Sequence, residues 1–493
     1  MKIALIIPMN STDKEKSFYD YQFYSKFLMS NKYVSYLLAI PVLVSLTPAE
    51  HEIRVFDENI CEIDFSWEAD LVGITARTMF SKKAYAIAEA YRKKGVKTVI
   101  GGIHASMCPE ETAQHCDSVV IGEAEYIWQG LLADAEQGQL KPVYKSEKTA
   151  DLAAAPMPDR KKLQMDRYLS DIIQTTKGCP FACEFCSVHA FDGQKIRHRA
   201  IDQVLREIQS MGNVKSAYKK KNAIFFADDN IIADKKYAKD LFTALKPIGV
   251  NWMCQASINI FKEDELLELM QASGCGAVFI GFESLSKDNL KIMKKGINEK
   301  YSYTKAIQKI QSYGILVHSS FIVGGDVDTQ DSFEELIDFI NSNNLLMPLI
   351  NIMTPFPGTK LFARLEKEGR IVHKDWNKYD TKQAVFTPLN MTGHALEAGY
   401  KKIVRSVYDF DAILKKLEHF WDMDFWHHAN QVNPIKFKYR LIFALRLFSL
   451  IRLSHPKRSR FILKIMPRVL FDKRVRISTI LTLMAYNDFA YSI

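Results

Sequence analysis

Short apolar runs alternate with amphipathic segments along the first 150 residues of the chain. The segments 81–94 and 126–137 space their apolar residues at helical intervals. The apolar runs, each predicted to be a buried strand, are 3–7, 52–56, 71–75, 98–100 and 118–121. Strands that alternate with helices predict an α/β domain with a doubly wound, Rossmann-like parallel sheet. Ligands of such sheets bind beyond the carboxyl ends of the strands. We expect this domain to span 1–150.

The alternation resumes after a linker at 147–158, which is rich in Ala and Pro and predicts a domain boundary. Further runs predicted as strands are 172–176, 223–227, 252–256, 277–281, 316–323 and 349–353, with helical spacing between them at 201–211, 235–245 and 263–272. Six strand–helix units predict a partial (β/α)6 barrel over 165–370, with its active site at the C-terminal ends of the strands. A mainly helical region is expected to follow, over 371–432.

The last segment, 433–493, is both apolar and basic. It holds 13 Lys and Arg against two acids, and Arg440, Arg446 and Arg452 recur at six-residue intervals among Leu, Ile and Phe. Such a basic amphipathic tail can lie in the headgroup plane of an anionic membrane. The alternative is a helical cap that packs on the barrel with its charges solvated. Nucleic-acid binding through the basic residues is disfavoured, because apolar residues are so dense here.

Other features bear on the compartment. No window of 18 uncharged apolar residues predicts a transmembrane helix, and the apolar start of the chain is too short for a signal peptide. Eight cysteines, three of them clustered, are typical of a reduced compartment. A cytoplasmic location is therefore expected, with the inner face of the membrane as the surface that the tail could reach. The scattered cysteines, read as structural, are Cys61, Cys108, Cys116, Cys254 and Cys275.

The clustered cysteines are Cys179, Cys183 and Cys186, in a loop directly after the first predicted barrel strand. Thiolates hold iron–sulfur clusters, and three of them can bind three irons of a [4Fe–4S] cube and leave the fourth iron open. Buried core thiols and a zinc site are the alternatives. Neither alternative explains why Gly178 precedes the thiols and why Pro and two Phe lie among them.

This Cys-x3-Cys-x2-Cys loop resembles that of the radical S-adenosylmethionine (SAM) superfamily. The resemblance implies that the open iron binds the amino and carboxylate groups of SAM. It also implies that the cluster donates an electron and cleaves SAM to a 5′-deoxyadenosyl radical. An enzyme of this kind needs a reducing partner such as flavodoxin or ferredoxin.

The ends of the barrel strands carry polar residues that the resemblance implies for SAM binding. Carboxylate and carbonyl oxygens suit the SAM ammonium, and glycine lets adenosine lie against the backbone. For the paired Asp residues, a helix N-cap is the alternative role. The predicted SAM-binding residues are Asp228, Asp229, Asn230, Gln255, Ser257, Glu283 and Gly324.

The segment 99–125 resembles the cobalamin-binding domain that precedes many radical SAM barrels. The predicted cobalamin-binding residues are Thr75, Arg77, Gly101, Gly102, His104, Gly122 and Glu123. The Asp-x-His-x-x-Gly motif that supplies a lower cobalt ligand in some cobalamin proteins is absent, and the loop after the first strand holds no His. Cobalamin, if bound, would be in the base-off form. For His104 a loop position satisfied by backbone is favoured over a cobalt ligand.

Together these features predict an enzyme that modifies an unactivated carbon of a hydrophobic small molecule or lipid, with methyl transfer as the outcome when cobalamin is bound. The branch resembles lipid- and isoprenoid-modifying enzymes such as hopanoid methylases. Without cobalamin, cyclisation, oxidation or carbon–carbon coupling becomes the expected outcome. A non-catalytic iron–sulfur redox or sensor protein is the alternative of another class. An enzyme acting on RNA is disfavoured, since no RNA-binding domain is recognisable.

Overall fold

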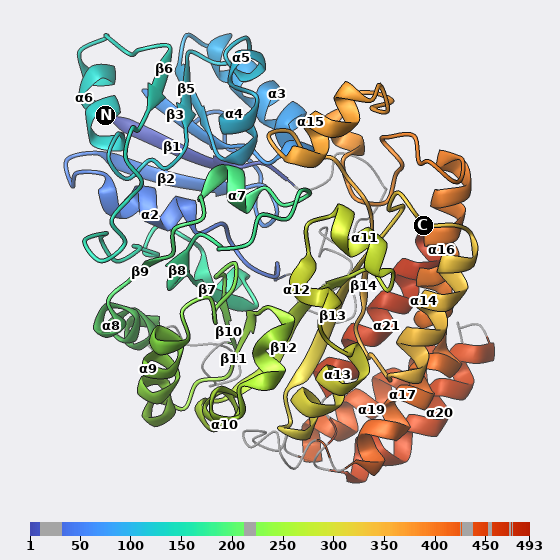
Figure 1. Ribbon diagram of the computed structural model, residues 1–493. Helices are drawn as coiled ribbons and strands as arrows, with labels where there is room; N and C mark the ends of the chain where they lie inside the picture. The colour runs from blue at the N-terminus through green and yellow to red at the C-terminus, as the bar shows by residue number, and fades with distance from the viewer. Residues whose placement is uncertain are drawn as a thin grey trace.

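Two parallel β-sheets organise the chain, and helices of its last third pack beside the second sheet (Figure 1). The computed structural model describes residues 1–9, 32–211, 223–423, 425, 437–451, 456–472, 475 and 477–493. The loop after the first strand, which was expected to supply no His ligand to cobalamin, lies largely outside these residues.

The N-terminal sheet is parallel and doubly wound, as predicted. Its strand order is β2 (Glu52–Asp57), β1 (Lys2–Ile7), β3 (Leu71–Thr75), β4 (Lys97–Gly101), β5 (Ser118–Ile121) and β6 (Val143–Lys145). One face of β1 packs with helices α2 (Ala39–Leu46) and α6 (Trp128–Glu136), and the other with α3 (Ser81–Arg92). Because β1 is buried on both faces, it is almost wholly apolar. The short elements α2 and β6 were not predicted from the sequence.

The second sheet is an open half-barrel whose six strands lie in chain order, which confirms the predicted barrel. They are β7 (Ser170–Ile173), β10 (Ala223–Phe226), β11 (Trp252–Gln255), β12 (Cys275–Glu283), β13 (Leu316–Val323) and β14 (Leu349–Ile352). The connecting helices include α8 (Ile201–Met211), α9 (Lys235–Leu245), α10 (Asp264–Ser273), α13 (Tyr303–Ser312) and α14 (Asp331–Ser342).

The first barrel strand ends earlier than predicted. Residues 176–177 leave the sheet as β8 (Thr176–Lys177) and pair antiparallel with β9 (Arg197–His198). We call this pair, with the residues 178–196 that it encloses, the cluster hairpin. It contains the short helix α7 (Val188–Phe191) and all three clustered cysteines.

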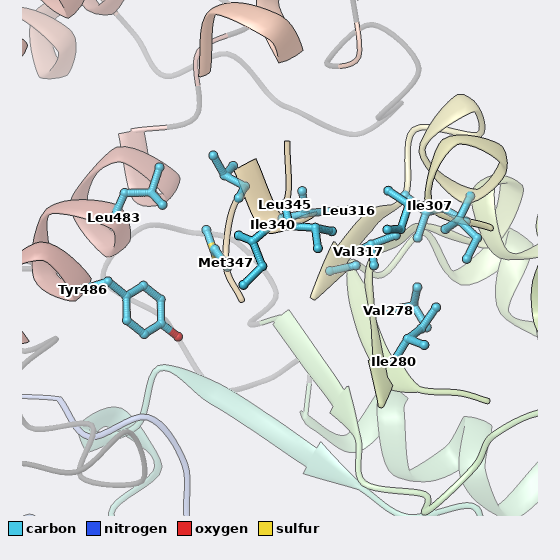
Figure 2. Packing of buried hydrophobic residues seen from close by; sticks show 14 of the residues in the cluster. Val278, Ile280, Ile307, Leu316, Val317, Ile340, Leu345, Met347, Leu483 and Tyr486 are labelled. Atoms are coloured by element: carbon cyan, nitrogen blue, oxygen red, sulfur yellow. The ribbon is translucent and has the colours of Figure 1, made fainter. Parts of the chain in front are cut away.

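The last third of the chain is helical. It comprises α15 (Lys360–Lys367), α16 (Gly393–Val407), α17 (Phe410–Asp422), α19 (Phe437–Ile451), α20 (Pro456–Phe471) and α21 (Ile477–Ser492). Leu483 and Tyr486 of α21 belong to the same apolar core as Ile340 and Met347 of the barrel (Figure 2). The C-terminal helices therefore cap the barrel and share its core.

Two basic residues of the tail make defined contacts within the fold. Arg440 is 2% exposed and donates hydrogen bonds to the carbonyls of Val469 and Asp472, which satisfies the C-terminal end of α20. Lys457 pairs with Asp409 at 2.8 Å. Arg440 does not face solvent, so its charge is neither presented to a membrane nor solvated, as the two interpretations of the tail expected. Arg452 and the side chain of Arg446 lie outside the described residues.

Across the described ranges, no helix has both the length and the apolar character needed to cross a membrane.

Candidate active site

The cluster hairpin brings the three cysteines to the C-terminal edge of the half-barrel, after β7. Gly178 turns the chain with φ +91°, and a Cβ at this position would collide with the carbonyl oxygen of Lys195. The amide of Cys179 donates to the Gly193 carbonyl at 3.2 Å, and the amide of Cys186 donates to that of Cys183 at 3.2 Å. These bonds fold the loop back on itself and gather the thiols.

The three thiols fit the ligand set of a cluster. Burial raises the pKa of each thiol, that of Cys186 to about 11. Each also lies close enough to another thiol for that neighbour to raise its pKa further. Lys295 lowers all three pKa values, so its ammonium group lies near each of the thiols. Cysteine thiolates are the ligands that an iron–sulfur cube requires.

Asp228 anchors the start of the cluster hairpin through hydrogen bonds. Its carboxylate is fully buried and accepts hydrogen bonds from Thr175 Oγ1 at 2.7 Å and Thr176 Oγ1 at 2.6 Å. The amides of Thr175 and Thr176 donate to it as well. With these donors, the carboxylate of Asp228 orients the loop that leads to the cysteines.

Asp229 is the carboxylate that remains available. Its Oδ2 atom is buried without a hydrogen-bond partner. Burial and the nearby Asp192 and Asp228 raise the pKa of Asp229 to about 7. The side chain lies near enough to Cys179 and Cys186 to raise their pKa values. The carboxylate also has a backbone hydrogen bond from Gly178, so Oδ2 is the atom suited to receive a cation or a donor of a bound ligand.

Asn230 and Ser257 meet across the ends of β10 and β11. Ser257 N donates to Asn230 Oδ1 at 3.0 Å, and Asn230 Nδ2 donates to Ser257 Oγ at 3.1 Å. The side chain of Gln255, at the end of β11, is exposed. The alternative role of helix N-cap for Asp228 and Asp229 is wrong, because Asp234 accepts from the amide of Tyr237 and caps α9 instead.

Glu283 ends β12 in a left-handed conformation, with φ +64°, beside an irregularity in the strand register. Its carboxylate accepts from Lys295 Nζ at 3.0 Å and lies close to Cys183. A left-handed conformation is unusual for a residue with a side chain and is often found at functional sites. Gly324 also has a positive φ, +89°, but a Cβ there would press on Leu396 of α16, so its glycine is explained by packing.

A cavity of about 300 Å³ lies between the N-terminal sheet and the cluster hairpin. Most of its wall is apolar and comes from α2, from the strand ends of the N-terminal domain and from the linker. Lys177 and Asp192 of the cluster hairpin close one side. The predicted cobalamin-binding residues in its wall are Thr75, Gly101, Gly102, Gly122 and Glu123.

Two of these glycines are required by the backbone. Gly102 has φ +96°, and a Cβ there would lie 2.8 Å from the carbonyl oxygen of Ala76. Gly122 has φ +80° and donates its amide to Ser106 Oγ at 2.9 Å. Both strand ends therefore present backbone, rather than side chains, to the cavity.

His104 and Arg77 do not line this cavity. His104 is fully buried, and its Nε2 lies 3.0 Å from the hydroxyl of Tyr85. Burial lowers the pKa of His104 to about 4. The partner of its ring is a tyrosine and not the backbone, so the predicted backbone partner is wrong. Arg77 is exposed.

Around His104 lies a polar contact that the sequence did not predict. Glu111 accepts hydrogen bonds from Trp376 Nε1 at 2.8 and 2.9 Å and from the Tyr85 hydroxyl at 3.1 Å. Trp376 belongs to η5 (Trp376–Lys378), after the barrel. Cys108 and His104 approach Glu111 closely enough to share a metal ion, but the donors just named already occupy its carboxylate. The contact joins the N-terminal domain to the region after the barrel.

Sequence reasoning also missed two cations at the site: Lys177, which is part of the cluster hairpin, and Lys295, which lies near its thiols. Lysines are common on surfaces, and no motif spacing distinguishes these two. Their signal is structural, because each has a buried carboxylate partner: Glu123 for Lys177 and Glu283 for Lys295.

Family models match three segments of the chain. The model for the radical SAM superfamily matches residues 173–340, and that for the B12 binding domain matches 44–132. A domain of unknown function matches 359–491.

Curated relatives extend over most of the chain. The bacteriochlorophyllide d C-12(1)-methyltransferase of Chlorobaculum tepidum is 35% identical over 78% of this chain and 85% of its own length. The hopanoid C-2 methylase of Rhodopseudomonas palustris is 29% identical over 80% of this chain and 74% of its own length.

Solved structures share the fold. The cobalamin-dependent SAM radical enzyme OxsB superposes with a TM-score of 0.63 at 14% identity and covers 100% of this chain and 84% of its own. The radical SAM methyltransferase TsrM from Kitasatospora setae superposes with a TM-score of 0.58 at 16% identity, over 74% of this chain and 76% of its own. With its three thiols, its half-barrel and its preceding B12-binding domain, the chain belongs to the radical SAM superfamily, as an enzyme of the group with an N-terminal B12-binding domain.

Proposed function

We propose that the protein is a cobalamin-dependent radical SAM methyltransferase that acts on an unactivated carbon of a hydrophobic substrate. The observation that carries the proposal is the cavity between the strand ends of the B12-binding domain and the cluster hairpin. Relatives named as methyltransferases of bacteriochlorophyllides and hopanoids support it. The hopanoid relative supports a hydrophobic substrate.

Each part of the site has a role in this proposal. Cys179, Cys183 and Cys186 would hold three irons of the cluster. When bound, cluster and SAM supply one-electron cleavage of SAM for hydrogen abstraction, and cobalamin supplies the methyl group. Asp229 offers its unpartnered Oδ2 atom to the SAM ammonium, and Asn230 and Glu283 stand at the ends of β10 and β12. A flavodoxin or ferredoxin would deliver the electron.

The cobalamin pocket would be built mainly from backbone. Gly122 has open space where its Cβ would stand, whereas Gly102 admits no Cβ because it lies against Ala76. Thr75 and Gly101 complete the same wall. Within the described residues, no histidine lines this cavity, which supports a base-off cofactor.

Anaerobic reconstitution tests the proposal. The purified protein should bind about four irons and one cobalamin per chain, and the cobalamin spectrum should be that of the base-off form. With SAM, a reductant and a bacteriochlorophyllide or hopanoid, it should form 5′-deoxyadenosine and a methylated product. Deoxyadenosine formation without cobalt binding would favour cyclisation, oxidation or coupling instead. Failure to cleave SAM would favour a redox or sensor protein.

We further propose that the protein contacts an anionic membrane surface. Along α19, one face exposes Phe437, Leu441, Leu445 and Phe448, which are 43–62% exposed. Their spacing places them on a single helical stripe. The neighbouring α20 adds Leu463 and Phe471 to the exposed apolar surface.

Basic side chains border this apolar stripe. Lys438, Arg460 and Lys464 are exposed, and neither α19 nor α20 contains an acidic residue. Apolar and cationic groups on one surface are the two attractions that interfacial binding uses. We therefore assign peripheral contact to the inner face of the membrane to α19 and α20.

Vesicle flotation tests this contact without any enzyme assay. The full chain should float with anionic vesicles at low salt and less with neutral vesicles. Leu445→Glu combined with Phe448→Glu should abolish flotation, whereas Leu389→Glu, which changes an equally exposed leucine elsewhere, should not. Equal flotation of all three proteins would contradict the assignment.

A further inference from the structure

Glu123 lies just beyond the end of β5, yet its side chain reaches out of its own domain. The carboxylate accepts hydrogen bonds from Lys177 Nζ at 2.9 Å and from Arg197 Nη1 and Nη2 at 2.8 and 3.0 Å. The amide of Ala150, at the start of the barrel linker, donates to it at 2.6 Å. The Glu123 side chain is 6% exposed. Three segments thus converge on one buried carboxylate.

The two cationic partners are opposite each other in the cluster hairpin. Lys177 of β8 and Arg197 of β9 are paired in the antiparallel register. Cys179 follows Lys177 by two residues. Glu123 therefore contacts the hairpin at both ends of the cysteine loop, at Lys177 before it and at Arg197 after it. Glu125 adds a second carboxylate to Lys177, at 3.2 Å. We call this set, Glu123 and Glu125 with Lys177 and Arg197, the clasp.

The clasp is fully engaged and borders the cavity. Each oxygen of Glu123 has two donors, which leaves none of them directed at a ligand. Burial would raise the pKa of Glu123, but Arg197 and Lys177 lower it to about 2, so the carboxylate is ionised. Glu123 and Lys177 both lie in the wall of the cavity, beside Gly122. Glu123 was predicted to contact the cofactor directly, but neither of its oxygens is free to accept another hydrogen bond.

We infer that Glu123 is a positioning residue. Through Lys177 and Arg197 it fixes the cofactor cavity of the N-terminal domain to the hairpin that presents the cluster cysteines. This inference rests on the proposed function, because a methyl donor in the cavity and a radical generated at the cluster must act on the same substrate carbon. Reacting groups must be held within fractions of an ångström, and a displacement of about 1 Å can cost roughly a hundredfold in rate.

The first test separates SAM cleavage from methyl transfer. Glu123→Gln keeps the size of the side chain and removes its charge. The variant should bind iron as the wild type does and should form 5′-deoxyadenosine within about twofold of the wild-type rate. Methylated product per deoxyadenosine should fall at least about tenfold. The matched control is Glu89→Gln, which changes an exposed glutamate of the same domain that pairs with Lys93. An unchanged ratio, or a parallel loss of iron and both products, would overturn the inference.

A second test needs no methylated product, and it remains valid if the proposed function fails. The midpoint potential of the reconstituted cluster is measured by redox titration without substrate. Glu123→Gln leaves Lys177 less neutralised and should shift the potential upward, whereas Lys177→Met should shift it downward. The double variant should return near the wild-type value. Shifts of the same sign in both single variants, or none in either, would show that Glu123 serves only the packing of the domain.

Discussion

Gly178 shows how much the cluster depends on one backbone position. Its φ of +91° is costly for any residue with a Cβ, and the added methyl would also meet the carbonyl of Lys195. Gly95 has a similar φ of +79° with open space around its missing Cβ. The two glycines therefore separate the cost of backbone strain from the cost of a collision.

We expect Gly178→Ala to reduce the iron content after reconstitution to less than half, because the cysteine loop cannot close in the same way. Gly95→Ala, which carries the strain alone, should lose about 1 kcal/mol of unfolding free energy and keep its iron. Iron analysis and chemical denaturation measure both effects. Full iron content in Gly178→Ala would mean that the loop adapts.

Lys416 is a buried cation whose proton should make stability depend on pH. It is 2% exposed and donates to the carbonyl of Val407, at the end of α16. Burial lowers its pKa to about 7. Between this value and the unfolded value near 10.4, the unfolded chain holds a proton that the folded chain does not. The free energy of unfolding should therefore rise with pH in this window, by at most about 1.4 kcal/mol per pH unit.

The measurement compares the wild type with Lys416→Met in denaturation series from pH 7 to pH 10. The difference in unfolding free energy between the two proteins should change across this window in favour of the wild type. A constant difference would show that Lys416 keeps its ordinary pKa in the folded state.

At the scale of elements, a chain of ion pairs joins the cluster loop to the region after the barrel. Glu184, between two of the cysteines, accepts from Arg364 Nη2 of α15 at 2.7 Å. Arg364 also reaches Asp326, after β13, at 2.7 Å, and Asp326 accepts from Arg370 at 2.9 Å. Glu184 is 5% exposed, so this pair lies largely out of water.

Arg364→Met should cost roughly 2–4 kcal/mol of unfolding free energy, because it leaves the buried carboxylate of Glu184 uncompensated, while Asp326 keeps Arg370. Adding Glu184→Gln should recover part of the loss. Chemical denaturation of the cluster-free protein measures both changes. The control is Arg206→Met, from an exposed pair with Asp202, which should stay within about 0.5 kcal/mol of the wild type. A lower free energy of unfolding in the double variant than in Arg364→Met would contradict this account.

The same scale shows what the sequence could predict. The barrel strands could be predicted, because they are short apolar runs between helical segments. The strands β8 and β9 could not, because two residues are too few to show a period. Asp228 and Asp229 were indistinguishable in the sequence, yet Asp228 holds the hairpin and Asp229 keeps one oxygen without a partner. Their difference depends on which way each side chain points at a strand end, and only tertiary structure decides that.

For the whole molecule, the C-terminal helices are part of the core and not an appendage. Phe461 of α20 packs against Phe410, and Tyr486 of α21 stacks on Tyr408 with ring centroids 4.7 Å apart. Asn487 donates to the carbonyl of Tyr408 at 2.7 Å. Removal of these helices would expose the apolar faces of α16 and α17.

We therefore expect deletion of 433–493 to yield an aggregating protein without a cooperative unfolding transition. Leu445→Glu, on the exposed face of α19, should change the unfolding free energy by no more than about 0.5 kcal/mol. Size-exclusion chromatography and thermal unfolding distinguish the two. A monomeric, cooperatively folded truncation would show that the barrel is stable without its cap.

The contact between Glu111 and Trp376 can form only late in the synthesis of the chain. The two residues are 265 positions apart, so at about 5–20 residues per second Trp376 is made on the order of 15 to 50 s after Glu111. Arg364, which forms an ion pair with Glu184, is likewise made long after the cysteines. Until Arg364 is made, the nascent cysteine loop lacks the ion pair that holds Glu184 in the finished protein. The late segments thus complete the surroundings of the cysteines only after most of the chain has been translated.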